Sequence, residues 1–336
     1  MQRVTLAHVA ARAGVSPTAA SLILNGKQNT GLSADTHKRV VEAASELNYR
    51  PNLMARGLRV ERSATLGFVS DRIASSRYAG SMIRGALQTA RSRDHTMFVT
   101  ETDGDRGEQD RAIEALLDRQ VDAIVLATVT GRVELPRQPL PVPLVLLNGT
   151  TGADEYAAVL PDEEGGARQA AQHLIGLGHR RVHVLGTSDP VHWTIPVRRR
   201  IESLHREFAE HGVDVVDVDL DEPVWDPDTG FDTATRAVRD HGPVTAVVAL
   251  NDSLAAGAYE GFRAAGLDVL RDVSVVSFDD DEIVSFLRPR LTTVALPFEA
   301  MGRRAIELAL GGAPEPREHL EPMTLRLRAS TRPASA

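Results

Sequence analysis

The sequence predicts a small all-α domain of helix-turn-helix type at the N-terminus, followed by an α/β core of two lobes with parallel sheets. Three observations lead to this fold class. Apolar residues recur at helical spacing near the N-terminus, and short β-rich runs alternate with helical patterns from residue 65 onward. The charge is also uneven, because residues 1–62 contain nine Lys or Arg and four acidic residues, a net charge of +5, whereas the whole chain has −8.

The first two predicted helices form a tight pair. Apolar residues recur at helical spacing over residues 6–13, and Gly14 then ends the helix. Ser16 is a suitable N-cap and Pro17 fits the first position of a second helix, which ends before Asn25. Two short helices around such a turn favour a helix-turn-helix, whose second helix enters a major groove of DNA. An ordinary helical hairpin is the alternative.

A third helix and a short basic segment follow. The third helix is expected at residues 33–48, and Pro51 disfavours its continuation. Residues 53–59 are basic and too few to form a stable helix alone. The charge of +5 in residues 1–62, against −13 in the remainder, indicates a polyanionic partner at the N-terminus.

The remainder of the chain predicts two lobes built from βαβ units. The first lobe has expected strands at 66–70, 97–100, 123–127 and 144–148, and helices at 78–94 and 108–119. The second has expected helices at 163–176, 197–211, 230–241 and 252–266, and strands at 182–186, 213–218, 246–250 and 273–278. A crossing strand and a helix are then expected within 291–310, with Pro297 between them, and an edge strand at 323–329.

These patterns divide the chain into a helix-turn-helix domain at residues 1–49, a hinge and linker at 50–63, and a core at 64–329. The N-lobe is expected at about 64–161 and 293–319, and the C-lobe at about 162–291 and 320–329. Residues 330–336 are expected to form a disordered tail. Two such lobes leave a cleft at the carboxyl ends of their strands, where small ligands bind.

Composition excludes several classes of protein. The chain has no cysteine, so disulfides, thiol catalysis and thiolate metal sites are excluded. The polar, basic N-terminus lacks a signal sequence and no stretch approaches a membrane span, which predicts a cytoplasmic protein. No Ser-His-Asp arrangement or dinucleotide-binding fingerprint is present, and we predict neither enzymatic activity nor a cofactor.

Several motifs resemble those of the LacI/GalR family of bacterial transcription regulators. In the headpiece they are Val4-Thr5-Leu6, Val9-Ala10, Ala13-Gly14-Val15-Ser16, Leu24-Asn25-Gly26 and Tyr49-Arg50-Pro51-Asn52. In the core they are residues 162–166, Gly178-His179-Arg180-Arg181, Asn251-Asp252, residues 274–280 and Leu291-Thr292-Thr293-Val294. The resemblance covers nearly all of residues 3–329 and implies a core similar to periplasmic binding proteins.

The resemblance implies which residues contact DNA. Phosphates are expected to be held by Thr5, Ser16, Ser21 and Asn25, and bases are expected to face Pro17, Thr18 and Leu22. Leu22 stands where the family often has arginine, so it can touch a thymine methyl group but cannot bond bidentately to guanine. In the hinge, DNA contact is expected from Asn52, Ala55, Arg56 and Leu58, with Leu58 as a minor-groove wedge. An exposed linker leucine is the alternative for Leu58.

The resemblance also implies a set of effector-binding residues in the cleft. They are Tyr78, Asp103, Trp193, Arg198, Trp225, Asn251 and Asp279. Arginine and aspartate give charge-assisted bonds to hydroxyl groups, and aromatic rings stack on the C–H face of a sugar. Alternatively, Trp225 caps the core, and Arg198 lies on a solvated helix face as part of an arginine run.

Two clusters could suggest a metal site. Asp279, Asp280 and Asp281 are adjacent carboxylates at a strand end, but no phosphate-binding glycine loop accompanies them. His173, His179 and His183 fall on a helix, a turn and a strand, which disfavours zinc. Effector binding, capping and solvation are the preferred interpretations, and no metal is predicted.

Together these observations predict a DNA-binding transcriptional regulator, most simply a repressor. It is expected to act as a homodimer on a pseudo-palindromic operator of double-stranded DNA, and a small-molecule effector, a mono- or oligosaccharide, is expected to change operator affinity. The alternatives are a plain sugar-binding protein, an enzyme that uses Asp279 to Asp281, and a regulator whose ligand strengthens DNA binding.

Overall fold

A computed structural model describes residues 4–24, 31–49, 63–72, 80–129, 131, 133–153, 155–222, 224–312 and 314–334. The chain forms two compact units, Met1–Ser63 and Ala64–Ala336. The boundary coincides with the start of the predicted α/β pattern. Within the described residues, no helix is both long enough and apolar enough to cross a membrane.

The N-terminal unit is a three-helix domain with its own small core. Its helices are α1 (Leu6–Ala13), α2 (Pro17–Leu24) and α3 (Ala34–Glu46). Gly14 ends α1 with a left-handed φ of 68°, and the Ser33 hydroxyl accepts the Thr36 N–H at 3.2 Å to cap α3. The core of this unit is formed by small and branched side chains: Val9, Ala10, Ala13, Ala20, Ile23, Val40, Ala43 and Ala44.

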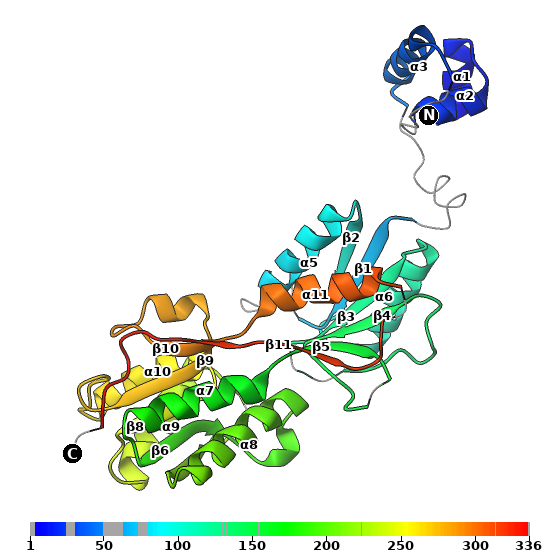
Figure 1. Cartoon of the computed structure of the whole chain (residues 1–336). Helices are drawn as coiled ribbons and strands as arrows, with labels where there is room; N and C mark the ends of the chain where they lie inside the picture. The colour runs from blue at the N-terminus through cyan, green and yellow to red at the C-terminus, as the bar shows by residue number, and fades with distance from the viewer. Residues whose placement is uncertain are drawn as a thin grey trace. The chain divides into compact units, whose positions relative to one another are not determined.

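The N-lobe of the second unit is a parallel sheet of six strands in the order β11-β5-β4-β3-β1-β2. The strands are β1 (Thr65–Ser70), β2 (Thr96–Glu101), β3 (Ala123–Ala127), β4 (Leu144–Leu147), β5 (Ala157–Pro161) and β11 (Glu318–Glu321). Alternate strand residues pack on the two faces. Helices α5 (Gly80–Ser92) and α11 (Phe298–Leu310) share one buried cluster, and α6 (Arg106–Asp118) shares the other (Figure 1).

The C-lobe is a second six-stranded sheet, in the order β12-β10-β9-β8-β6-β7. Its strands are β6 (Arg181–Thr187), β7 (Asp214–Asp219), β8 (Ala246–Ala249), β9 (Ser274–Asp279), β10 (Thr292–Ala295) and β12 (Thr324–Arg326), of which only β12 is antiparallel. The helices α7 (Glu163–Gly176), α8 (Ile195–Glu210), α9 (Pro227–Asp240) and α10 (Asp252–Ala264) complete the lobe. Short 3₁₀ turns follow β6 and β9, at Pro190–His192 and Glu282–Ser285.

The chain passes between the two sheets three times along its described part, after β5, after β10 and after β11. The predicted lobe boundaries need correction at two of these passages. Residues 293–319 were expected in the N-lobe, but β10 pairs with β9 in the C-lobe sheet. The expected boundary at residue 320 divides β11, which pairs entirely with β5 in the N-lobe. β5 and β11 were not predicted, because each is short and lies among turn-forming residues.

The expected disordered tail is also corrected over residues 330–334. The Ser330 side chain is fully buried, where it accepts the Thr292 N–H at 2.7 Å and donates to the Val275 carbonyl at 2.6 Å. His179 Nε2 lies 3.1 Å from the Arg332 carbonyl, and the Ala334 N–H donates to the Leu177 carbonyl at 2.8 Å. These hydrogen bonds attach the C-terminal segment to the C-lobe.

Close packing of α5 against α11 depends on two glycines. A Cβ atom added at Gly302 would lie 2.0 Å from the Met82 carbonyl oxygen, and one at Gly85 would lie 2.1 Å from the Glu299 carbonyl oxygen. Both obstacles are backbone atoms of the opposite helix, so relief requires the helices to separate. Figure 1 shows α11 alongside α5.

We expect Gly302→Ala to destabilise the core by about 1–3 kcal/mol, because overpacking forces the two helices apart. The measurement is chemical denaturation of the purified protein. Gly176→Ala at the end of α7 is the matched control, since a Cβ there meets nothing within 4 Å, and it should be neutral or slightly stabilising. Equal effects of the two substitutions would contradict the packing argument.

Candidate functional site

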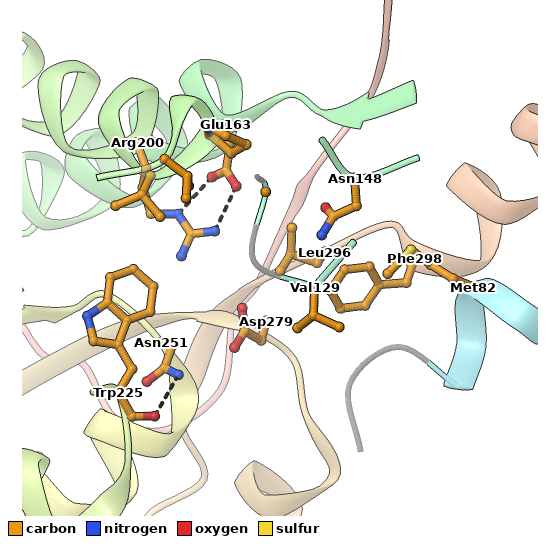
Figure 2. A pocket seen from close by; sticks show the side chains of 14 residues that line it. Met82, Val129, Asn148, Glu163, Arg200, Trp225, Asn251, Asp279, Leu296 and Phe298 are labelled. Atoms are coloured by element: carbon orange, nitrogen blue, oxygen red, sulfur yellow. Dashed lines mark hydrogen bonds and ion pairs between the residues drawn. The ribbon is translucent and has the colours of Figure 1, made fainter. Parts of the chain in front are cut away.

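A cavity of about 190 Å³ is lined by side chains from both lobes of the core (Figure 2). The N-lobe side contributes Met82, Val129, Gly131, Asn148 and Phe298, and the C-lobe side contributes Glu163, Thr194, Pro196, Val197, Arg200, Trp225, Asn251 and Asp279. Leu296, from the connection after β10, completes the lining. Polar groups therefore converge on an otherwise apolar chamber, as in small-molecule sites.

Parallel strands explain why these residues meet. Asn148 directly follows β4, Asn251 follows β8 after one residue, and Asp279 is the last residue of β9. All three lie at the carboxyl ends of their strands, where crossovers leave a crevice in open α/β sheets. The cavity lies at the carboxyl ends of the strands, where the cleft between the two lobes was predicted.

A buried ion pair forms the C-lobe wall of the cavity. Arg200 Nε donates to Glu163 Oε2 at 2.7 Å and Nη2 donates to Oε1 at 2.8 Å, and the two side chains are only 5% and 4% exposed. Nη1 also donates to the Leu250 carbonyl at 2.5 Å, and the guanidinium lies 4.3 Å from the centre of the Phe278 ring. Burial alone would lower the pKa of Arg200, but the Glu163 carboxylate raises it above its usual value.

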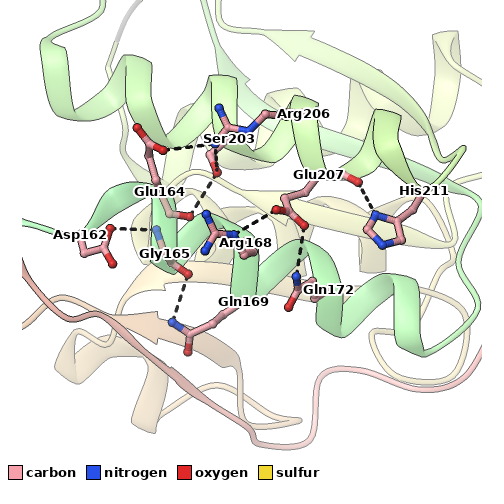
Figure 3. Close-up of polar contacts among 10 residues, drawn as sticks. All are labelled: Asp162, Glu164, Gly165, Arg168, Gln169, Gln172, Ser203, Arg206, Glu207 and His211. Carbon is pink, nitrogen blue, oxygen red and sulfur yellow. Dashed lines mark hydrogen bonds and ion pairs between the residues drawn. The ribbon is translucent and has the colours of Figure 1, made fainter.

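Contacts between α7 and α8 hold this ion pair in place (Figure 3). Arg168 Nε donates to Glu207 at 3.1 Å, and Gln172 Nε2 donates to the same carboxylate at 3.3 Å. The Ser203 hydroxyl donates to the Glu164 carbonyl at 3.2 Å. Because Glu163 opens α7 and Arg200 lies in the first half of α8, the two helices must keep this register for the pair to form.

Trp225 and Asn251 form a second polar corner. The Trp225 indole N–H donates to the Gly186 carbonyl at 3.0 Å, and the ring lines the cavity. Asn251 caps α10 by accepting the Leu254 N–H at 2.8 Å, and its Nδ2 lies 3.4 Å from the Trp225 carbonyl. Trp225 also packs against the C-lobe core, so it both caps that core and faces the cavity.

Asp279 has a strained backbone and lies near a second acid. Its φ is 115° and that of Asp280 is 59°, both in the left-handed half of the map where residues with a Cβ are disfavoured. Strain of this kind clusters at binding sites. Burial, and then the nearby Asp252 carboxylate, raise the pKa of Asp279 well above its ordinary value.

Asp252 lies behind the cavity and joins three segments. Its Oδ1 accepts the Thr293 hydroxyl of β10 at 2.8 Å and also contacts the Ser277 hydroxyl of β9. Its Oδ2 accepts the Asp281 N–H at 2.8 Å. Burial raises the pKa of Asp252 to about 7. The three hydrogen bonds stabilise the ionised carboxylate and so lower the pKa, but their effect is smaller than that of burial.

The N-lobe contributes an asparagine that sequence reasoning missed. Asn148 has a left-handed φ of 59°, and its Nδ2 donates to the Thr128 carbonyl at 2.8 Å. The Thr128 hydroxyl in turn donates to Asp71 at 2.6 Å. This chain of bonds fixes Asn148 across the cavity from the C-lobe wall. The available signal was its position immediately after a buried strand.

The predicted effector residues are only partly brought together. Trp225, Asn251 and Asp279 line the cavity, whereas Arg198, Trp193 and Asp103 do not. Tyr78 lies outside the described residues. Asp103 is 86% exposed beside Arg72, and Trp193 packs against the C-lobe core with the Arg198 guanidinium 5.7 Å from its ring centre.

The arginine that lines the cavity is Arg200 rather than Arg198. Residues two positions apart on an α-helix point about 200° apart, so the two side chains face opposite directions. Arg198 accordingly bonds to the Pro190 carbonyl at 3.1 Å and is 45% exposed, as expected for the solvated face considered as its alternative. Glu163 was missed together with Arg200, although the motif at residues 162–166 contains it.

Four residues of the two clusters that could suggest a metal have other partners. Asp280 pairs with Arg328 at 2.5 Å and Asp281 caps the turn that follows β9. His173 Nε2 lies 2.9 Å from the Thr331 hydroxyl, and His179 contacts Ser274 and Arg332. No group of three or more metal-ligating side chains occurs in the part of the chain that the structure describes.

In the N-terminal unit, several predicted DNA contacts lie at the start of α2. Ser16, Pro17 and Thr18 are exposed there, and Ser21 and Leu22 are half-buried on the same helix. The Ser16 hydroxyl accepts the Ala19 N–H at 3.2 Å, so it caps this helix. Thr5 is exposed just before α1. Asn25, Asn52, Ala55, Arg56 and Leu58 lie outside the described residues.

A helix-turn-helix domain joined to a two-lobed core with a ligand-sized cavity defines a class of protein, the ligand-responsive DNA-binding regulator. Comparison with known proteins agrees with this class. The family of bacterial regulatory proteins of the lacI type matches residues 5–52, and the periplasmic binding protein-like domain matches residues 171–331.

Individual relatives extend the match along the chain. The HTH-type transcriptional regulator reg1 of Streptomyces lividans is 34% identical over 331 residues, covering 93% of this chain and 91% of reg1. The regulator MalR of Streptomyces coelicolor is 32% identical over 328 residues, covering 93% and 91%. The lac repressor dimer bound to operator and the anti-inducer ONPF has a TM-score of 0.80 at 25% identity, covering 98% of this chain and 100% of that one.

The chain therefore belongs to the LacI family of bacterial regulatory proteins. It is a DNA-binding transcriptional regulator with an effector-binding core, as the sequence predicted. Its relatives are transcriptional regulators rather than enzymes.

The Asp252 carboxylate should make stability depend on pH. Its pKa rises on folding from 3.8 to about 7, so the folded protein holds this proton more tightly and loses stability as pH rises between these values. Relative to Asp252→Asn, the wild type should lose stability, by up to roughly 4 kcal/mol, as pH rises from about 4 to about 7. Chemical denaturation across this range measures the difference.

Asp240→Asn is the control for this prediction. Asp240 is exposed, and the hydrogen bond from Arg239 lowers its pKa, so it is ionised in both states above pH 5. The stability difference from wild type should therefore be constant between pH 5 and pH 8. Parallel profiles for Asp252→Asn and wild type would contradict the assignment.

Proposed function

We propose that the protein is a homodimeric repressor whose two headpieces bind a pseudo-palindromic operator, and whose affinity for that operator is set by a sugar in the core cavity. One observation carries the proposal: polar side chains from both lobes converge on a single chamber at the carboxyl ends of both sheets. A ligand held by Asn148 on one side and by Asn251 on the other stabilises one arrangement of the lobes over others. Coupling to DNA then follows by population shift.

The operator contacts that we propose follow the exposed start of α2. Ser16 and Ser21 hold phosphates together with Thr5 and Asn25, while Pro17, Thr18 and Leu22 face base edges. In the hinge, Asn52, Ala55 and Arg56 contact the DNA and Leu58 enters the minor groove as a wedge. The lac repressor dimer, to which this chain is similar, was solved bound to its operator, which supports a dimeric DNA complex here.

The effector contacts that we propose are centred on the two polar corners of the cavity. Arg200 and Asn251 donate to ligand hydroxyls, Asp279 and Asn148 accept from them, and Trp225 stacks on a sugar ring. Arg198, Trp193 and Asp103 have no contact with the cavity, so we do not assign them effector contacts. Phe298 and Leu296 supply apolar contact from the opposite side.

We propose that effector binding weakens operator binding, as in induction. In the contrary mode, the ligand binds in the same cavity and strengthens DNA binding. The two modes differ only in whether the ligand lowers or raises the affinity for the operator. Because the operator is chromosomal DNA, we place the protein in the cytoplasm. We propose no turnover of the ligand, because Arg200 and Glu163 are engaged in an ion pair and Asn251 caps α10.

Base reading by α2 can be tested through Leu22. Leu22→Arg should shift the preferred base at the contacted position toward guanine, because arginine bonds bidentately to its O6 and N7 atoms, with discrimination of about 1–3 kcal/mol. The measurement is selection and sequencing of bound genomic fragments by the purified protein without ligand. Val41→Arg on α3 adds the same charge at an exposed site, so it should raise affinity without changing the preferred sequence.

A recovered palindrome would support operator binding by a dimer. If the wild type enriches no fragment, repetition with a panel of neutral sugars tests the contrary mode, and enrichment that appears only with ligand would establish a co-repressor. Failure under both conditions would reject the proposed operator binding.

Effector binding can be tested by comparing the two tryptophans of the chain. Trp225→Ala should weaken sugar binding at least about tenfold, because burial of the apolar surface of the stacked ring contributes about 1.5–3 kcal/mol of binding free energy. Trp193→Ala removes an indole from the same lobe but outside the cavity, so it should leave sugar affinity unchanged. Equal losses for the two variants would place the ligand elsewhere.

A further inference from the structure

The cavity is lined by more acidic than basic side chains. Among the described residues that line it, Arg200 is the one cation, whereas Glu163 and Asp279 are two carboxylic acids. Asp252 lies immediately behind Asp279 and influences its ionisation. An anionic ligand would therefore approach a site whose local charge is neutral at best and negative when Asp279 ionises.

The positive charge of Arg200 is already compensated. Glu163 takes the Nε–H and one Nη2–H, and the Leu250 carbonyl takes one Nη1–H. Each terminal nitrogen therefore keeps a second N–H group. These groups can donate to ligand hydroxyls, but Glu163 already occupies the side-on fork of Nε and Nη2, so a phosphate could use that fork only by displacing the carboxylate.

The neighbouring hollow provides no excess positive charge either. It has a volume of about 750 Å³ and shares Asp279, Leu296 and Phe298 with the cavity. Its lining contains Arg84 and Arg326, but these are outnumbered by acids: Asp279, Asp280, Asp281 and Glu282. A phosphate group that extended from the cavity into this hollow would again meet carboxylates.

Size also limits the ligand. The cavity volume of about 190 Å³ is below the roughly 300–1,000 Å³ of pockets for drug-sized molecules. Its walls combine aromatic and aliphatic faces with amide groups, and they match a single ring that bears hydroxyl groups. One sugar ring fits this description better than two.

We propose that the cavity selects an uncharged monosaccharide over its phosphorylated form, and that Glu163 determines this selectivity by compensating the charge of Arg200. The inference rests on the proposed function, because it assumes that the cavity is the effector site. Beyond the proposed function, the inference specifies the charge and the size of the ligand, and it names Glu163 as a residue that determines specificity.

The test uses the full-length protein and isothermal titration calorimetry with matched pairs of probes. The probes are D-glucose, D-galactose and D-ribose, each beside its terminal phosphate ester, and one disaccharide, maltose. We expect one neutral monosaccharide to bind and its phosphate to bind at least about 100-fold more weakly, because juxtaposed like charges are strongly disfavoured in a buried site. Equal or tighter binding of a phosphate ester would overturn the proposal, and tighter binding of maltose would overturn its size limit.

Glu163→Gln tests the role of the residue directly. Loss of the carboxylate exposes the charge of Arg200, so the preference for the neutral sugar over its phosphate should fall at least about tenfold. Asp279 and Asp252 still oppose that charge, which favours retention of the fold. Glu164→Gln is the matched control, since Glu164 is 50% exposed, pairs with Arg206 and lies outside the cavity, and it should keep the wild-type ratio.

Two failures are distinguishable in this design. A phosphate ester whose binding is lost in Trp225→Ala occupies the cavity, which overturns the selectivity but keeps the proposed function. If neither neutral nor charged sugars bind, and none changes operator affinity, the proposed effector site fails and the selectivity fails with it. Should Glu163→Gln not fold, the wild-type pairs decide the charge and size preference, and Glu163→Asp, which keeps the carboxylate, tests the residue: it should retain the preference for the neutral sugar, and loss of that preference would contradict the role assigned to charge.

Discussion

The Asp252 carboxylate is the interaction on which the architecture of the site depends. It is fully buried and receives hydrogen bonds from β9, from β10 and from the loop that follows β9. β10 leads directly into the passage to the N-lobe, and β9 ends at Asp279, whose backbone is strained. The Asp252 carboxylate therefore fixes β10, through which the chain leaves the C-lobe. It also fixes the end of β9, from which Asp279 points into the cavity. The three hydrogen bonds that the Asp252 carboxylate accepts offset its desolvation only in part, since burial still raises its pKa to about 7.

The Glu163–Arg200 pair plays a similar part on the other wall of the cavity. A buried ion pair adds little to stability compared with apolar residues of the same volume, but removal of one partner leaves an uncompensated charge. The pair also couples the first turn of α7 to α8, since both helices must keep their register for the two hydrogen bonds to form. Rigid walls of this kind let a ligand act on the arrangement of the lobes rather than on single side chains.

The sequence predicted most of the architecture, because periodicity and capping residues are local. The bounds of β3 and α7 were predicted to the residue, and the alternation of strands and helices implied parallel sheets. Strand partners are not local, so the sheet to which β10 or β11 belongs could not be read from spacing. Prediction of the cavity arginine required the exact register of α8. A difference of two residues decides that Arg200 points into the cavity and Arg198 away from it. Asn148 carried no pattern of its own, since its role comes from the bonds that hold it across from the other lobe.

The discontinuous N-lobe has a consequence for the order in which the protein can form during synthesis. The headpiece has a core made entirely of residues 9–44, so it can fold as soon as it leaves the ribosome. The N-lobe sheet cannot be completed so early, because α11 covers Leu66 and Phe68, and β11 closes the edge beside β5, near the end of the chain. The DNA-binding unit is thus available long before the unit that controls it. A nascent or truncated chain that ends before α11 retains the headpiece but lacks Phe298, so it lacks a complete effector cavity.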